Sequence, residues 1–161
     1  MGKLKPKREI TPEIKDVIRW LKEYSFVAAV QVKSCSDDGV AISTNWRVDL
    51  PTKFESAGKT ESGIRSIEAV TWVFPWEYPL CAPQPTLRED FPLTLPHINP
   101  VVEGEGVSPC IAEVDLTDLL HSSGTEAVFG AMTHWLNNAA SGELLCPVQG
   151  WEPVRRDRRC R

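Results

Sequence analysis

Residues 26–50 read FVAAVQVKSCSDDGVAISTNWRVDL, two alternating runs separated by an Asp38-Gly39 turn. Successive side chains of a strand point to opposite faces of a sheet, so a period of two predicts an amphipathic β-hairpin. Such a hairpin needs helices or a second sheet against its apolar face, and it therefore decides the fold class. The alternate positions that form this face are Phe26, Ala28, Val30 and Val32, then Val40, Ile42, Thr44, Trp46, Val48 and Leu50.

Helical periodicity appears on both sides of this region. Thr11 is a good N-cap, Pro12 fits the first helical position, and the pattern predicts a helix from Pro12 to Tyr24. A second helix is predicted from Thr125 to Ala140, with Ser141-Gly142 as its stop. The apolar stripes of the two helices are Ile14, Val17, Ile18, Leu21 and Tyr24, and Val128, Ala131, Met132, Trp135 and Ala139.

Further strand signals follow the hairpin. A polar connection covers residues 52–63, Ile64–Phe74 reads as a third strand, and Thr86–Glu89 reads as a short fourth strand. An N-terminal helix, an antiparallel meander of about four strands and a late helix predict an α+β domain with its helices grouped on the sheet.

Length and charge indicate one domain with two basic ends. The 161 residues suit a single core. Residues 1–9 carry +3 and residues 155–161 carry +4, whereas residues 10–154 hold nine basic and 20 acidic side chains. We therefore predict a basic arm (1–9), an acidic domain (10–154) and a basic tail (155–161). The acidic domain argues against a nucleic-acid-binding surface.

The cysteines exclude some kinds of site. Five cysteines, with no C-x-x-C and no Cys/His cluster at zinc spacing, predict no structural metal and no cofactor. The chain shows no apolar run of membrane-spanning length and no apolar signal core behind its first lysines. We expect a cytoplasmic protein with reduced thiols, among them Cys81 as a buried packing residue.

A proline-dense passage from Pro75 to Pro109 leads to Cys110. Proline removes a backbone donor and restricts the residue before it, so this passage predicts a long ordered loop, and such loops are usually functional. Four elements occur in order: Tyr78-Pro79-Leu80, Ala82-Pro83-Gln84-Pro85-Thr86-Leu87, His97-Ile98-Asn99, and Ser108-Pro109-Cys110-Ile111.

This order resembles the active-site region of ubiquitin-conjugating enzymes, in which a Y-P-F/P-P element precedes H-P-N and a thioester-forming cysteine. The conjugating-enzyme fold also has the same order of helices and strands. The resemblance implies that Cys110 is the thioester cysteine and that His97 and Asn99 match the first and third residues of H-P-N. It implies for Asn99 a role in supporting the oxyanion or bracing the loop. A thiolate suits such acyl transfer chemically.

Two departures from the family pattern concern the same loop. Asn99 precedes Cys110 by 11 positions, a few more than usual, because residues 101–106 enlarge the loop. Pro109 also stands before the nucleophile, where the family usually has an apolar residue with a backbone donor.

Loss of a proton from the attacking lysine would be helped by a nearby carboxylate. The candidates are Glu113, Asp115 and Asp118, with Asp90 more distant, and each also reads as an ordinary surface acid.

These departures, with Gly150-Trp151-Glu152-Pro153, are similar to divergent bacterial conjugating-enzyme-like proteins found in antiphage defence (CBASS-like) operons. The resemblance implies a cytoplasmic transferase that makes an isopeptide bond. The carried partner would be a cGAS-like nucleotidyltransferase or a ubiquitin-like protein. No G-x-G-x-x-G adenylation motif is present, so any ATP-dependent activation would come from a separate enzyme.

Three alternatives stay open on the sequence alone. The chain can be a catalytically silent interaction module of the same fold. It can be a cysteine hydrolase that uses Cys110 with His97 or His121, although such a base needs a third group to orient it. Cys110 can also be an inert core thiol, because cysteine is often buried.

Overall fold

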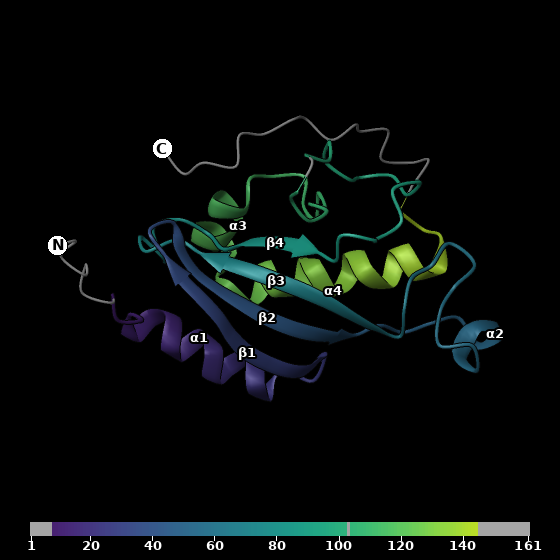
Figure 1. Ribbon diagram of the computed structural model, residues 1–161, viewed down its shortest axis with the longest axis horizontal. Helices are drawn as coiled ribbons and strands as arrows, with labels where there is room; N and C mark the ends of the chain where they lie inside the picture. Colours follow the sequence, from purple (N-terminus) through teal and green to yellow (C-terminus); the bar gives the residue numbers. More distant parts are fainter. Residues whose placement is uncertain (1–7, 103, 145–161) are drawn as a thin grey trace, which may run out of the picture.

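The computed structural model describes residues 8–102 and 104–144, and their helices and strands follow the predicted order (Figure 1). A single antiparallel sheet has the strand order β1-β2-β3-β4. The elements are α1 (Pro12–Glu23), β1 (Val27–Ser36), β2 (Gly39–Arg47), α2 (Thr52–Glu55), β3 (Ile67–Phe74), β4 (Gln84–Leu87), α3 (Leu116–Ser123) and α4 (Thr125–Ser141).

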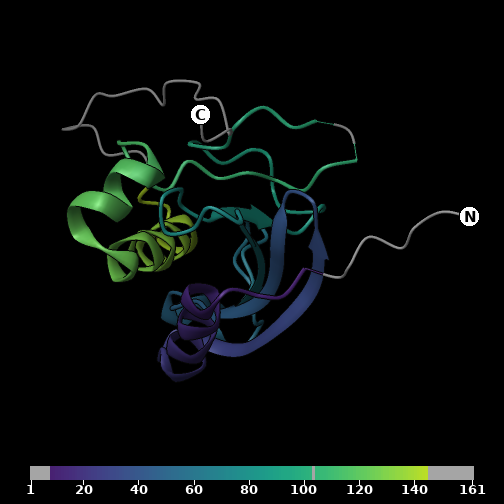
Figure 2. The same cartoon turned by 90° about the vertical axis from the view of Figure 1, so that its left-hand side faces the viewer.

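The fold has two layers, with α1, α3 and α4 on the same side of the sheet (Figure 2). Trp20 of α1 stacks on Phe129 of α4, and the Tyr24 hydroxyl shares a 3.1 Å hydrogen bond with that of Thr133. The predicted α+β class with helices grouped on the sheet is confirmed. The sheet's other face carries small and polar side chains such as Ala41, Ser43 and Asn45.

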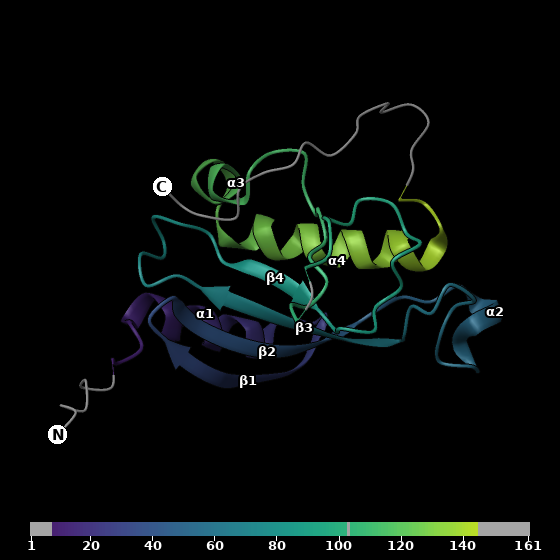
Figure 3. The same cartoon turned by 45° about the horizontal axis from the view of Figure 1, so that its top comes forward.

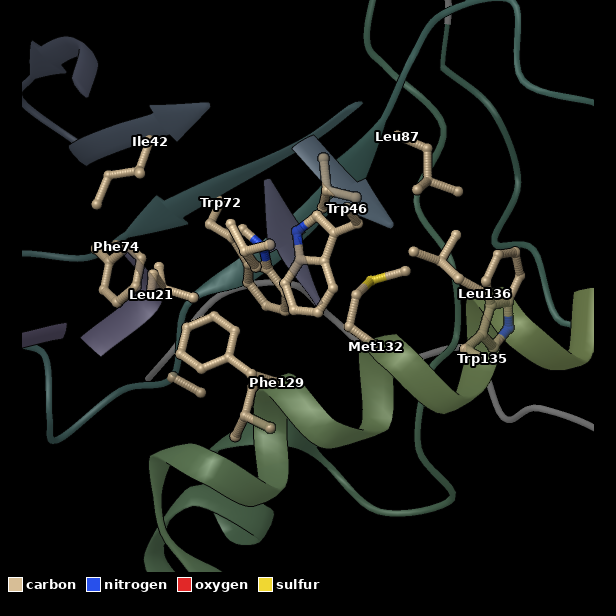
Figure 4. Packing of buried hydrophobic residues seen from close by; sticks show 14 of the residues in the cluster. Leu21, Ile42, Trp46, Trp72, Phe74, Leu87, Phe129, Met132, Trp135 and Leu136 are labelled. Carbon is tan, nitrogen blue, oxygen red and sulfur yellow. The ribbon is translucent and has the colours of Figure 1, made fainter. Parts of the chain in front are cut away.

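Aromatic side chains fill the space between the layers (Figure 4). Phe129 lies at the centre, with its ring centroid 4.8 Å from that of Trp72 and 6.3 Å from that of Trp46. All three rings are fully buried, as are Phe74 and Met132. The prediction for the late helix placed its stripe correctly at Val128, Met132 and Trp135 but omitted Phe129.

The residues predicted to face the core are confirmed for β2 and only partly for β1. Alternate residues of β2 from Val40 to Trp46 are buried. In β1, a register shift between Val27 and Ala29 inserts one residue, so that Val27 lies opposite Trp46 and is buried. A β-bulge changes which alternate positions face inward. The prediction is therefore wrong for Ala28, which is exposed, whereas Phe26, before the bulge, still packs against the core as predicted.

Several boundaries differ from those predicted. Strand β3 begins at Ile67 rather than Ile64, and β4 covers Gln84–Leu87 rather than Thr86–Glu89. The polar connection contains the short helix α2. Helix α3 was not predicted, because its eight residues are too few to show a clear stripe of apolar side chains.

A buried ion pair closes the sheet beside β4. Glu68 of β3 is fully buried, and Arg88 bonds both of its carboxylate oxygens at 2.9 and 3.1 Å. Arg88 also donates to the carbonyl of Gly63, and the amide of Arg65 donates to Glu68. These bonds tie the connection between α2 and β3 to the end of β4.

The basic ends lie almost wholly outside the described residues. Of the predicted arm (1–9), only Arg8 and Glu9 are described. The predicted domain end at residue 154 and the tail (155–161) also lie outside them, so these limits stay predictions.

Candidate functional site

The segment that carries Cys110 is anchored to the free edge of β4. The amide of Leu87 donates to the carbonyl of Val107 at 2.7 Å, and the two residues form an isolated antiparallel bridge. Val107 is 1% exposed, and Ser108 and Pro109 are also buried. In Figure 3 the chain between β4 and α3, coloured teal to green, runs past this edge of the sheet beside α4.

Gly106 makes this anchoring possible. A Cβ at this position would lie 2.3 Å from Cγ2 of Thr86 and 2.7 Å from the carbonyl oxygen of Leu87. Both distances are far shorter than an ordinary van der Waals contact. The backbone therefore approaches β4 more closely than any residue with a side chain allows.

A second short ladder places the His97-Ile98-Asn99 segment against Ser108-Pro109-Cys110. The amide of Cys110 donates to the carbonyl of His97 at 2.8 Å, and the amide of Asn99 donates to that of Ser108 at 2.9 Å. Ile98 and Pro109 lie opposite each other between these two bonds. In such a pair neither amide bonds the other strand, so Pro109 costs this ladder no hydrogen bond.

This ladder shows how the lengthened loop affects the position of Asn99 relative to Cys110. The enlargement lies between Asn99 and Ser108, and the hydrogen bond between these residues closes its base. The extra residues therefore do not separate Asn99 from the cysteine along the ladder. Opposite residues share a face and alternate residues return to it, so Asn99 and Cys110 are diagonal neighbours on one face.

Cys110 is a half-buried thiol at the end of this ladder, and it is not disulfide-bonded. Its Sγ lies 3.6 Å from the carbonyl oxygen of Ala112, to which the thiol donates. Cys35 is likewise half-buried and outside a disulfide, at the far end of β1. Cys81 is 5% exposed, as expected, but it is disulfide-bonded. The expectation that every thiol is reduced is therefore wrong for Cys81.

His97 joins the cysteine loop to the chain beyond α4. Its Nε2 lies 2.8 Å from the carbonyl oxygen of Leu144. A carbonyl only accepts, so Nε2 carries the proton. His97 also has a φ of 59°, a left-handed conformation that is uncommon for residues other than glycine. The main-chain carbonyl of His97 holds Cys110, while its side chain bonds a different segment.

The candidate acids have unequal surroundings. Asp115 is the N-cap of α3, and its Oδ1 accepts the amide of Thr117 at 2.8 Å. Asp118 is exposed in the first turn of the same helix, and Glu113 is exposed before it. Asp90 is ion-paired with Arg88 and Arg65, and the hydrogen bond from Arg88 lowers the pKa of its carboxyl.

The Tyr78-Pro79-Leu80 element supports the helices that follow the cysteine. The hydroxyl of Tyr78 shares a 2.8 Å hydrogen bond with that of Thr125, the first residue of α4. Burial raises the pKa of Tyr78, although the bond to Thr125 acts in the opposite direction. The amide of Ala82 donates to the hydroxyl of Thr117 in α3. This loop therefore fixes the start of both helices.

Two positioning residues were not identified from the sequence. Gly106 lies in a run rich in glycine and glutamate that reads as a loop, and only the contact with β4 reveals its role. Thr117 is one of many threonines, and the amide that it accepts is 35 positions away. For Gly106, the signal available in the sequence was a glycine placed two residues before Ser108-Pro109-Cys110.

His121, the other candidate base, bonds the loop that carries Tyr78. It is exposed in the last turn of α3, and its Nε2 lies 3.2 Å from the carbonyl oxygen of Pro79. Both His97 and His121 thus bond main-chain carbonyls through Nε2. These bonds leave Nδ1 of each ring as the nitrogen that can accept a proton, so they do not decide the hydrolase alternative.

A comparison of the sequence with models of known protein families gives a match that agrees with this arrangement of Cys110 beside a four-stranded sheet. A sequence model described as prokaryotic E2 family A matches residues 14–160 of the chain. The chain belongs to prokaryotic E2 family A. It is a divergent bacterial E2-like protein, and the family is of the ubiquitin-conjugating kind, which acts on a protein partner.

Searches of curated proteins and of solved structures gave no significant match. No helix within residues 8–102 and 104–144 is long and apolar enough to cross a membrane. The same ranges contain no group of three or more His, Cys, Asp or Glu side chains arranged to hold a metal ion.

Proposed function

We propose that this E2-like protein carries the C-terminal carboxyl of a partner protein as a thioester on Cys110 and transfers it to an amine. The observation that carries the proposal is the ladder of residues 97–99 and 108–110. It holds a half-exposed thiol that is not disulfide-bonded at the edge of the sheet, with Asn99 on the same face. Cysteine is the side chain suited to accept and release an acyl group near neutral pH.

Exposed aliphatic side chains on the segments that flank the ladder support a polypeptide as the carried group. Val114 follows the cysteine by four positions and is 48% exposed, and Val101 and Val102 on the enlarged loop are 47% and 53% exposed. Exposed apolar side chains on the loops of an active-site region favour the docking of a peptide segment.

The reaction has two balanced steps. In the first, the Cys110 thiolate attacks the carbonyl carbon of an activated carboxyl, and the delivering enzyme's own thiolate leaves. In the second, a lysine amine attacks the new thioester, the tetrahedral oxyanion collapses, and the Cys110 thiolate leaves as the isopeptide bond forms. The amine proton passes to a base. Activation requires ATP, which a separate activating enzyme would use.

Asn99 is the proposed donor to the oxyanion. The amide of Cys110 is occupied by the carbonyl of His97, so a side-chain donor is needed at this point of the ladder. In a regular ladder diagonal neighbours are about 7–8 Å apart. The oxyanion lies beyond Sγ, which shortens the remaining distance to the Asn99 amide. Such a donor typically contributes 10²–10³-fold, or about 2.7–4 kcal/mol.

Asp118 is the better of the two proposed acid/base residues. One oxygen of Asp115 already caps α3, whereas Asp118 is exposed in the next turn. A carboxylate that accepts the amine proton must be within hydrogen-bond reach of the lysine. We assign this role to Asp118, with Asp115 holding the helix that presents it.

The resemblance to defence proteins suggests the partner and the setting. We propose that the carried protein is a cGAS-like nucleotidyltransferase or a ubiquitin-like protein, that the setting is antiviral defence of the CBASS kind, and that the protein works in the cytoplasm. Neighbouring genes for an activating enzyme, a nucleotidyltransferase or a ubiquitin-like protein would select among these partners.

The proposal is tested by loading the purified protein with a cognate partner, the activating enzyme and ATP. An adduct that disappears on treatment with thiol reductant is expected. Cys110→Ala should remove it, and Cys110→Ser should leave a more stable oxyester, because an alkoxide is a poorer leaving group. Cys35→Ala is the matched control, since Cys35 is the other half-buried thiol outside a disulfide in the described chain. Loss of the adduct in Cys35→Ala with its retention in Cys110→Ala would overturn the proposal.

A catalytically silent interaction module is the second candidate. It agrees with the same fold and with the exposed valines on the flanking loops, but it assigns no function to the Cys110 thiol. Partner binding that survives Cys110→Ala, with no reductant-sensitive adduct in the wild type under any loading condition, would favour the silent module.

A further inference from the structure

A groove of about 590 Å³ lies where α1, the loop of Tyr78 and the junction of α3 and α4 meet. It is separate from the ladder, since none of its lining residues belongs to the segment 97–111. Its floor is apolar and consists of Val17, Trp20, Tyr78 and Pro79. Val17 and Tyr78 are almost fully buried, whereas Trp20 is half-exposed and stacks on Tyr24.

The rim of this groove is acidic. Glu13 and Asp16 of α1 stand on one side and Glu126 of α4 on the other, and the lining residues include neither lysine nor arginine. Asp16 is paired with Arg19 outside the groove. Among the described residues, Glu13 and Glu126 form no ion pair. An apolar floor with an aromatic ring and a carboxylate rim matches a cation with a planar face, and arginine has both properties.

The chain itself carries such a segment. Residues 155–161 read RRDRRCR, with five arginines against one aspartate. The family match extends to residue 160, so this segment lies almost wholly within the matched sequence. Its net charge of +4 is opposite in sign to that of the rim, and each arginine can both stack on Trp20 and bond a carboxylate.

The segment is long enough to reach the groove. The groove lies at the start of α4, and the described chain ends at Leu144, three residues after α4 ends. A helix of 17 residues spans about 25 Å at its usual rise. Residues 145–154 span at most about 33–36 Å when extended. Figure 1 shows the two ends of α4 on opposite sides of the molecule.

We propose that the arginine-rich segment 155–161 docks in the groove between α1 and α4 of its own chain. Arginine guanidinium groups pair with Glu13 and Glu126 across the groove, and one of them stacks on Trp20. The segment then shields α1 and the α3–α4 junction from any cationic partner. This docking does not depend on thioester chemistry at Cys110.

Hydrogen exchange followed by mass spectrometry tests the docking on the full chain, in reductant so that no disulfide of Cys81 contributes. The wild type is compared with a variant carrying Arg155→Ser, Arg156→Ser, Arg158→Ser and Arg159→Ser. Exchange in residues 12–20 and 123–128 should be roughly three- to tenfold faster in the variant, because an intramolecular contact of this kind is strengthened by high effective concentration. Peptides from β2 and β3 should be unchanged.

Exchanging the charges of the groove and the segment tests their pairing directly. A groove variant with Glu13→Lys and Glu126→Lys should lose the protection, as the tail variant does. Adding Arg→Glu at the same four tail positions to this groove variant should restore the protection. Glu113→Lys with Asp118→Lys, at and just before the start of α3, is the matched control outside the groove, and it should leave the protection intact. Rescue in the combined protein distinguishes a lost contact from a damaged helix.

Three results would overturn the proposal. Equal exchange of wild type and tail variant in residues 12–20 would show that the segment lies elsewhere. Loss of protection in the Glu113→Lys and Asp118→Lys control, but not in the groove variant, would place the segment on the acids that follow Cys110 in the chain. Protection that vanishes on dilution would mean that the groove holds the segment of a second copy.

Discussion

Strand β4 separates two regions that are held together in different ways. On one side, β1–β3 pack against α1 and α4 through buried aromatic rings centred on Phe129. On the other side, the Cys110 segment is held mainly by main-chain bonds to Leu87 and His97 and by the close approach of Gly106. The first region should determine stability, and the second should position the thiol at little cost to the fold.

Removing the ring of Phe129 should break the first region. Phe129→Ala deletes contacts with Trp20, Trp46 and Trp72 and should lower the free energy of unfolding by about 3–5 kcal/mol. Urea denaturation measures this loss. Leu80→Ala is the control, because Leu80 is 71% exposed and should change stability by no more than about 0.5 kcal/mol. Similar losses in both variants would mean that the rings do not form the centre of the core.

Asn99→Ala acts on the second region. It should slow transfer to lysine by roughly 10²–10³-fold, with thioester formation much less affected, if the amide supports the aminolysis oxyanion. Single-turnover discharge of the loaded protein measures the step. Equal slowing of loading and discharge, together with a lower melting temperature, would instead show that Asn99 braces the loop.

Gly106→Ala tests the anchoring of the cysteine segment to β4. The new methyl group would overlap Thr86 and the carbonyl of Leu87, so the segment must move away from the sheet. We expect a loss of about 1–3 kcal/mol in stability and a slower loading of Cys110, up to about 10²-fold.

Gly130→Ala provides the matched control for this change. A Cβ at Gly130 meets no atom within 4 Å, and the residue lies inside α4. Alanine there should stabilise the protein by up to about 1 kcal/mol and leave loading unchanged. If Gly106→Ala behaves like Gly130→Ala, the close approach to β4 is not what positions Cys110.

The smallest effect concerns Asp90, at the corner where both regions meet. The bond from Arg88 lowers the pKa of the Asp90 carboxyl, so its contribution to stability is present above the ordinary pKa of about 4 and is lost as pH falls through the lowered value. The difference in melting temperature between wild type and Asp90→Asn should therefore stay constant from pH 6 to about pH 4 and shrink as the pH falls further. A difference that does not shrink below about pH 4 would show that the ion pair does not contribute.

The sequence predicted the first region better than the second, and the reason is physical. Alternation in β2 and the stripe of α4 record burial directly, so those elements were found with small errors at their ends. The bulge in β1 and the central place of Phe129 depend on how the layers meet, which periodicity does not record. Cys110, His97 and Asn99 were proposed from motif order, whereas their ladder depends on bonds between residues 9 and 13 positions apart.

The central claim is that Cys110, and not another thiol, becomes acylated. The loaded protein is treated with iodoacetamide under denaturing conditions without reductant, digested, and the alkylated fraction of each cysteine is measured. The account requires that Cys110 be protected in proportion to loading while Cys35 is fully alkylated. Full alkylation of Cys110 in the loaded protein, with protection appearing at Cys35, would contradict it.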